Sequence, residues 1–135
     1  MLKNFYLYLA TIPVFFLIDM LWLGFVAKDF YRRQLGYLMR AETNWLAALI
    51  FYLIFIVGLL IFGVLPAIEK GSLTHALIYG GLFGFFCYAT FDLTSYALIR
   101  DFPLKVVIVD LLWGTVLSAA VAAASFYIGH KWILS

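Results

Sequence analysis

The sequence predicts an all-α membrane protein, a four-helix up-down bundle, and two observations lead to that fold class. The first is composition: 67% of the 135 residues are hydrophobic and 12% are charged. A soluble domain is about half apolar and about a quarter charged, and its core could not absorb the difference. The second is a set of four long apolar segments, each near the roughly 20 residues that a helix needs to cross a bilayer. We therefore expect lipid to be the solvent of most side chains.

The chain is long enough for one domain of ordinary size, so residues 1–135 are expected to form a single integral membrane domain. Its spans are predicted at about residues 5–27, 45–68, 75–99 and 104–132. Helices are expected because every backbone polar group in lipid needs an internal partner. Gly71 and Pro103 mark short connections between the last three spans, and short connections predict antiparallel neighbours.

The connection between the first two spans is the only long one. Its sequence, "KDFYRRQLGYLMRAETN" (residues 28–44), mixes basic and apolar residues. Tyr31, Leu35 and Leu38 recur at the spacing of one helix face, which predicts an amphipathic helix at the membrane interface. Gly36 interrupts this pattern, so an irregular basic loop is an equal alternative.

The basic residues predict an orientation. Six of the nine lysines and arginines fall in the two connections on one side of the bundle: Lys28, Arg32, Arg33, Arg40, Arg100 and Lys105. The positive-inside rule then predicts that these connections are cytoplasmic and that both termini lie outside. Arg32, Arg33, Arg100 and Lys105 are the predicted interfacial basic residues. We expect Arg100 and Lys105 to extend toward acidic groups in the membrane, because long basic side chains can snorkel.

Three aspartates lie inside the predicted spans: Asp19, Asp92 and Asp110. Each is six to eight residues from the end of its span. At about 1.5 Å rise per residue, each is roughly 10 Å below the same membrane face. A charge at the centre of a spanning helix costs about 2.5–3.5 kcal/mol on insertion scales, so off-centre aspartates cost less but still favour the bundle interior. The expected result is one acidic layer.

Hydrogen-bond donors accompany these aspartates. A tryptophan follows Asp19 and Asp110 at the third position, on the same helix face, and Asp92 is flanked by hydroxyl side chains. The predicted ligand- or ion-binding residues are Asp19, Trp22, Tyr88, Asp92, Ser95, Asp110 and Trp113. No His–Cys cluster is present in the sequence, so no metal site, cofactor or catalytic residue is assigned.

Small residues recur every four positions in the last two spans. Ala76, Gly80 and Gly84 form one row, and Gly114, Ser118 and Ala122 form the other. Such rows let membrane helices approach closely. The single cysteine, Cys87, excludes an intramolecular disulfide and is expected to serve in packing.

Three kinds of function fit these features. The preferred one is binding or transport of a small ligand, a cation or a proton, since carboxylates among aromatic rings suit each of them. A structural or accessory membrane subunit, with the aspartates as interhelical hydrogen-bond glue, is the first alternative. The second is a lipid-modifying membrane enzyme or its partner, although no nucleophile elbow or phosphate loop is present in the sequence.

The expected partners follow from charge and size. A net charge of +2 is too small to indicate a nucleic-acid partner. The lipid bilayer is the expected surrounding, and a homodimer would complete a site that four short spans enclose only in part.

Three stretches carry a family resemblance: "IDMLWLGFVAKDFYRRQLG", "YATFDLTSYALIRDFPL" and "VDLLWGTVLSA". They resemble the signature stretches of a family of small bacterial membrane proteins catalogued as domain of unknown function 2177, and the likeness runs along nearly the whole chain. The resemblance implies a multi-pass protein of the bacterial inner (plasma) membrane and supplies no activity. The family pattern commonly has an asparagine where this chain has Ser95, so the resemblance implies no amide chemistry at this position.

Overall fold

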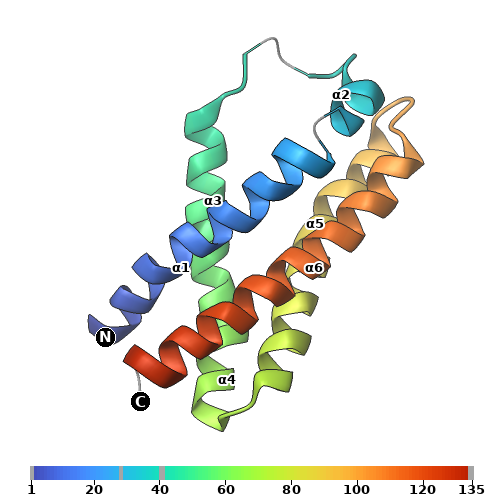
Figure 1. Ribbon diagram of the computed structural model, residues 1–135. Coiled ribbons are helices and arrows are strands. Elements are labelled where there is room, and N and C mark those ends of the chain that lie inside the picture. The colour runs from blue at the N-terminus through green and yellow to red at the C-terminus, as the bar shows by residue number, and fades with distance from the viewer. Residues whose placement is uncertain (1, 28, 40–41, 134–135) are drawn as a thin grey trace.

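The computed structural model describes residues 2–27, 29–39 and 42–133. Over these residues it contains four helices long and apolar enough to cross a membrane: Leu2–Phe25, Trp45–Lys70, Leu73–Leu98 and Leu104–Ile133. The predicted all-α membrane fold is therefore confirmed (Figure 1). Two of the six cations that predict the orientation, Lys28 and Arg40, lie outside the described residues.

Several spans combine an α-helix with a π-helical turn, which the sequence pattern does not reveal. In chain order the elements are α1 (Leu2–Leu21), η1 (Trp22–Val26), α2 (Phe30–Leu35), α3 (Trp45–Leu59), η2 (Leu60–Val64), α4 (Leu65–Lys70), α5 (Leu73–Leu98), α6 (Leu104–Ile128) and η3 (Gly129–Ile133). The turns η1, η2 and η3 continue the first, second and fourth spans. Single π-helical turns inside longer helices often occur at functional sites, and η1 lies at the site described below.

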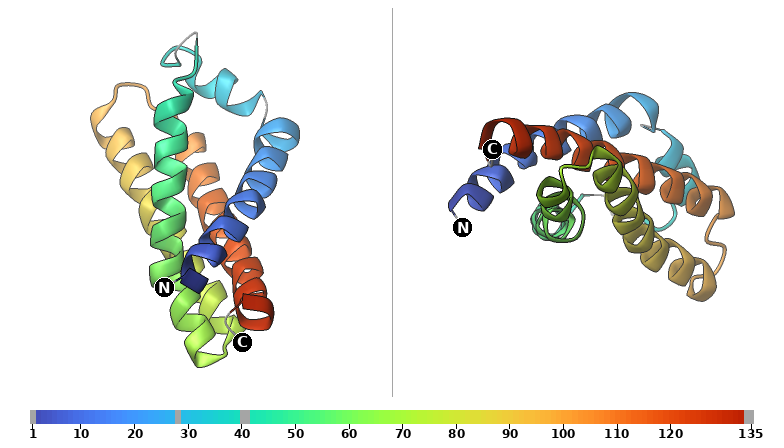
Figure 2. Two further views of the ribbon diagram at one scale, coloured as in Figure 1. Left: turned by 90° about the vertical axis from the view of Figure 1, so that its left-hand side faces the viewer. Right: turned by 90° about the horizontal axis from the view of Figure 1, so that it is seen from below.

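Helices α5 and α6 form the tightest pair of the bundle and run antiparallel (Figure 1, Figure 2). The two predicted rows of small residues face each other in this pair. A Cβ atom on Gly80 would overlap that of Ala122, and one on Gly84 would overlap the hydroxyl of Ser118. Close packing of these helices therefore requires glycine at both positions, as the small-residue spacing predicts.

The second span contacts α5 mainly through its C-terminal half. A Cβ on Gly58 would lie 2.5 Å from the Phe83 ring, and one on Gly63 would lie 3.2 Å from the backbone of Gly80. Toward its N-terminus α3 diverges from α5, as the two ribbon views show (Figure 1, Figure 2). The bundle is consequently closed near α4 and more open near α2.

Two apolar clusters hold these elements together. The larger joins α1, the second span and α6, and its fully buried members include Phe15, Ile56 and Leu117. The smaller consists of Phe102, Val106 and Val107, with Phe30, Tyr31 and Leu35 packed against it. It anchors α2 on the start of α6.

The long connection was expected to be either an amphipathic helix or an irregular basic loop, and the structure contains a short helix there. A helix forms at Phe30–Leu35, so the loop is not wholly irregular. Tyr31 and Leu35 pack inward as predicted, but Leu38 lies in the turn after Gly36 and is exposed. The predicted helical face is thus two residues long rather than three, because the helix ends where glycine, a poor helix former, interrupts it.

Local sequence signals fix the ends of the spans. The side chain of Asn44 accepts a hydrogen bond from the amide of Ala47 at the start of α3, and Ser72 accepts one from the amide of His75 at the start of α5. Gly71 adopts a left-handed conformation (φ +63°) directly after α4. Gly71 and Ser72 thus turn the chain between the second and third spans within two residues.

Candidate functional site

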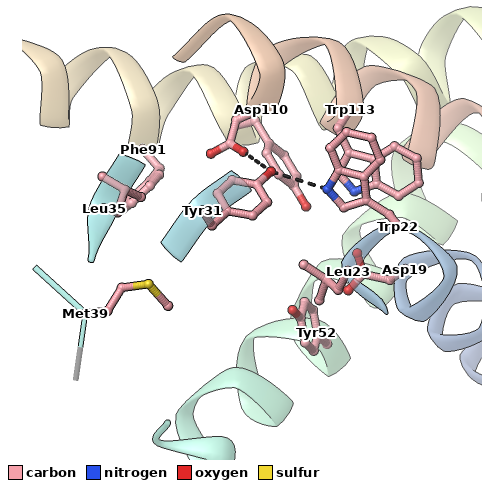
Figure 3. A pocket seen from close by; sticks show the side chains of 11 residues that line it. Asp19, Trp22, Leu23, Tyr31, Leu35, Met39, Tyr52, Phe91, Asp110 and Trp113 are labelled. Atoms are coloured by element: carbon pink, nitrogen blue, oxygen red, sulfur yellow. Dashed lines mark hydrogen bonds between the residues drawn. The ribbon is translucent and has the colours of Figure 1, made fainter. Parts of the chain in front are cut away.

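A cavity of about 360 Å³ lies at the α2 end of the bundle. It is lined by Asp19, Trp22, Leu23, Tyr31, Leu35, Met39, Tyr52, Tyr88, Phe91, Asp110 and Trp113. Figure 3 shows these side chains converging from all four spans and from α2. Six of the eleven are aromatic and two are carboxylates, which is an apolar pocket with a few convergent polar groups.

The three intramembrane aspartates come from three helices and are nearly inaccessible. The exposed fraction is 4% for Asp19, 0% for Asp92 and 8% for Asp110. Asp19 and Asp110 line the cavity, whereas Asp92 lies outside its lining and is an electrostatic neighbour of Asp110. Carboxyl groups buried to this degree either take up a proton or require a partner, because burying an uncompensated charge is costly.

Asp110 has such a partner in Tyr31. The Tyr31 hydroxyl donates a hydrogen bond to the Asp110 carboxylate, and it accepts one from the Trp22 indole at 3.3 Å (Figure 3). The Trp22 ring in turn stacks on Trp113, with 4.5 Å between ring centroids and 9° between ring planes. This chain of contacts connects α2 to both η1 and α6, so α2 forms one wall of the cavity.

The Tyr31 phenol remains protonated in this arrangement. Burial raises its pKa above the ordinary value, and its hydrogen bond to Asp110 and the carboxylate's charge raise it further. A neutral phenol can donate to the carboxylate at any physiological pH. The contact is therefore a stable charge-assisted hydrogen bond.

Asp19 lacks such a partner. Its Oδ2 atom is buried and forms no hydrogen bond with any described residue. The Trp113 indole and the Tyr52 phenol are its nearest polar neighbours, yet Trp113 Nε1 is also buried without a partner among the described residues. The Asp19 carboxyl and the Trp113 indole thus lie close together in the cavity wall, but they do not form a well-aligned hydrogen bond.

The spacing of tryptophan after aspartate predicts that each indole donates within its own helix, and this is wrong. The Trp22 indole donates to Tyr31 of α2 instead of Asp19. The Trp113 indole faces Asp19 of α1 instead of Asp110. The stacking of the two rings across the interface of α1 and α6 sets both orientations, and contacts between helices override neighbour relations within a helix.

Asp92 and Ser95 are buried on α5 but do not line the cavity. Neither oxygen of Asp92 has a hydrogen-bond partner among the described residues, so the flanking hydroxyls expected to donate to it do not. The Tyr88 ring instead covers Gly114, where a Cβ would overlap it. Of the seven predicted site residues, the cavity therefore brings together Asp19, Trp22, Tyr88, Asp110 and Trp113.

The predicted interfacial basic residues are exposed: Arg32, Arg33, Arg100 and Lys105. Arg100 and Lys105 do not reach the aspartates, because no ion pair joins them within the described part of the chain. Arg32 and Arg33 line a separate surface pocket with Asp29. The described lining of the main cavity thus contains two carboxylates and no cation.

The geometry does not resemble a metal centre. Over residues 2–27, 29–39 and 42–133, no three His, Cys, Asp or Glu side chains converge closely enough to hold one ion. The cavity is better described as two carboxylates set in a box of aromatic rings.

Six lining residues are absent from the predicted site: Leu23, Tyr31, Leu35, Tyr52, Met39 and Phe91. A signal existed for three of them. Tyr31 and Leu35 lie on the predicted amphipathic face of the long connection, and Tyr52 is seven residues after the start of its span. The three aspartates were placed at one depth because each is six to eight residues from the end of its span, and the same count places Tyr52 at that depth.

The fold and the cavity define a multi-pass membrane protein in which carboxylates are buried among aromatic rings. The chain belongs to the family described as predicted membrane protein (DUF2177), whose model matches residues 4–127. The match includes every residue of the cavity lining and confirms the resemblance noted from the three sequence stretches. No curated protein and no solved structure matches the chain.

Proposed function

We propose that this protein binds a small organic cation, of the quaternary ammonium type, in the cavity at the α2 end of the bundle. The proposal rests on the environment of Asp19, which lines an aromatic cavity and has only 4% of its surface exposed. Its Oδ2 atom has no hydrogen-bond partner among the described residues. A bound cation would compensate this buried charge.

The chemistry of the cavity wall favours an organic cation over a metal ion. Mg²⁺ and Ca²⁺ take about six to eight oxygen ligands, and only two carboxylates line the cavity. An alkylammonium group, by contrast, is attracted to the faces of Trp, Tyr and Phe rings through their quadrupoles. The stacked Trp22–Trp113 pair and the phenols of Tyr52 and Tyr88 supply such surfaces.

The same observation argues against hydrogen-bond glue as the whole role of the aspartates. Glue requires that the carboxylates accept bonds from neighbouring helices. Asp110 does so through Tyr31. Asp92 and Asp19 Oδ2, by contrast, have no donor in good hydrogen-bond geometry among the described residues, although Asp110 lies beside Asp92 and both Trp113 and Tyr52 lie beside Asp19. Leaving a buried acceptor unsatisfied costs about 1–3 kcal/mol, so two of the three aspartates would weaken the fold they were meant to hold.

We further propose that the cavity is near the cytoplasmic face of a bacterial inner membrane and that both termini lie outside. Six of the nine basic residues belong to the two connections at the α2 end, and such residues concentrate on the cytoplasmic side. A cation bound there is available for transport, which would add release at the opposite face to the binding step.

Binding can be tested by calorimetric titration of tetramethylammonium into the protein in lipid nanodiscs. Asp19→Asn keeps size and removes charge, and we expect it to weaken binding by about tenfold, the equivalent of about 1.4 kcal/mol. Asp101→Asn is the matched control. Asp101 is exposed in the connection at the same end, and its positive φ of 59° is one that asparagine tolerates.

Equal affinity of wild type and Asp19→Asn would refute the proposed site. A fall in thermal stability of Asp19→Asn with unchanged tetramethylammonium affinity would instead favour a structural role for the carboxylate.

A further inference from the structure

A second cavity adjoins the first. It also measures about 360 Å³, and it shares Tyr52, Tyr88, Phe91 and Asp110 with the first cavity. Its remaining wall comes from α3 and α5 and includes Phe51 and Cys87. The two cavities therefore share a wall that includes Asp110, and residues of α3 and α5 line the rest of the second one.

The gap between α3 and α5 follows from how these helices pack. They are held together near Gly58 and Gly63, where a Cβ would lie 2.5 Å from Phe83 and 3.2 Å from Gly80, respectively. Toward the α2 end they diverge (Figure 1). At the mouth of the gap, 47% of Phe51 and 57% of Phe91 are exposed. Both helices are candidate membrane spans, so the side chains exposed at this mouth would meet lipid in the bilayer.

Hydrogen bonds and apolar contacts hold α2 against the first cavity. Tyr31 donates to Asp110 and accepts from Trp22, and α2 packs on the apolar cluster at the start of α6. A ligand that entered by displacing α2 would have to break both hydrogen bonds. A ligand arriving between α3 and α5 would break neither.

We propose that the ligand is a single-chain amphiphilic cation that enters from the bilayer through the gap between α3 and α5. The inference rests on the proposed cation binding. Its ammonium head would lie in the first cavity near Asp19, and its alkyl chain would pass Tyr88 and lie along the gap against Phe51 and Cys87. This placement matches the gap, which is apolar at the lipid side and acidic at its inner end.

The amphiphile fits because each part finds a suitable environment. An alkyl chain that stays in contact with lipid exposes no apolar surface to water. The head leaves the interface only where a buried carboxylate and aromatic faces replace its hydration. A purely hydrophilic cation lacks the chain that would carry it to the mouth of the gap.

A plug in the gap tests the route. Ala48 lines the second cavity and is half-buried on α3, whereas the neighbouring Ala47 is exposed. The probes are tritiated dodecyltrimethylammonium, which partitions into nanodisc lipid, and tritiated tetramethylammonium, which shares its head group but has no chain. We expect Ala48→Phe to slow the uptake of the dodecyl probe about tenfold or more, because the added ring must be displaced.

The controls separate the route from the site. Ala47→Phe should take up the dodecyl probe as fast as wild type, and Ala48→Phe should bind tetramethylammonium with unchanged affinity. Unaltered uptake of the dodecyl probe by Ala48→Phe, with tetramethylammonium binding intact, would overturn lateral entry and leave the proposed function standing. Wild-type protein that binds neither probe would overturn the proposed function itself.

A second variant covers the case in which Ala48→Phe does not fold. Phe51→Ala removes a half-exposed ring from the mouth of the gap. We expect faster uptake of the dodecyl probe and unchanged affinity for tetramethylammonium. Uptake that is equal to wild type or slower in this variant would count against the route.

Discussion

The Tyr31 hydroxyl donates a hydrogen bond to the Asp110 carboxylate across 79 positions of the sequence. This bond joins α2, a helix of six residues, to the first turns of the longest apolar span. A helix this short is unstable by itself, so its position depends on that bond and on the cluster around Phe102. The contact explains how a connection between spans can form a wall of the cavity.

Removing the Tyr31 hydroxyl should loosen α2. Tyr31→Phe keeps the ring but leaves Asp110 without its donor, and hydrogen bonds to charged groups contribute about 1.5–3 kcal/mol. We expect a lower thermal midpoint in nanodiscs and faster amide hydrogen exchange in α2. Tyr37→Phe is the control, because the Tyr37 hydroxyl donates to the exposed backbone oxygen of Asp101 at 2.6 Å. If both variants lost equal stability, the contact with Asp110 would have no special role.

The same contact predicts a response to alkaline pH. The pKa of Tyr31 is raised above its ordinary value of 10.0, first by burial and then by Asp110. Between that value and the raised pKa, the unfolded chain has released the proton and the folded chain retains it. Rising pH therefore favours unfolding in this window, whereas the contribution of Tyr31 is constant below it.

Spectrophotometric titration measures this effect. Phenolate absorbance near pH 11 should be the same in Tyr31→Phe and in wild type, because the Tyr31 phenol contributes nothing until a higher pH. Lower absorbance in Tyr31→Phe at that pH would mean that Tyr31 ionises normally and that the phenol is not held by the carboxylate.

The sequence predicted those site residues whose burial in a membrane is energetically costly, namely the aspartates. Aspartates are expensive in lipid, so their depth in the spans indicates an interior location, and Asp19 and Asp110 indeed line the cavity. Tyrosine carries no comparable cost, so Tyr52 and Tyr31 gave no signal of equal strength. The contribution of α2 to the cavity depends on a contact between distant segments, which spacing within one segment does not describe.

Hydrogen-bond partners were less predictable than helix faces. Residues three apart share a helix face, and this correctly groups Asp110 with Trp113 on α6. Which side chain the indole meets depends on the neighbouring helix, and there the Trp22 ring turns Trp113 toward Asp19. The divergence of α3 from α5 is likewise a result of packing at Gly58 and Gly63, and the apolar pattern of the span does not encode it.

Replacing Asp92 should be tolerated by the fold. Asp92 is completely buried, and neither of its oxygens has a hydrogen-bond donor in good geometry among the described residues, its polar neighbour being the carboxyl group of Asp110. Removing an unsatisfied buried polar group recovers up to about 1–3 kcal/mol. We expect Asp92→Leu to have the thermal stability of wild type or higher, and Asp110→Leu to be less stable because Tyr31 loses its acceptor. A large loss of stability in Asp92→Leu would revive the interhelical glue hypothesis.

Adding one methyl group between α5 and α6 should test the packing that supports the cavity. A Cβ on Gly84 would overlap both the Ser118 hydroxyl and the backbone oxygen of Gly114. Because a backbone atom cannot move aside as a side chain can, the helices must separate, and overpacking of this kind costs about 1–3 kcal/mol or more. Gly84→Ala should therefore lower the thermal midpoint and weaken tetramethylammonium binding, since Tyr88 and Asp110 come from these two helices.

Gly24→Ala is the matched control, because a Cβ there would meet nothing within 4 Å. Similar stability of the two variants would show that α5 and α6 are not packed as closely as their small-residue rows indicate.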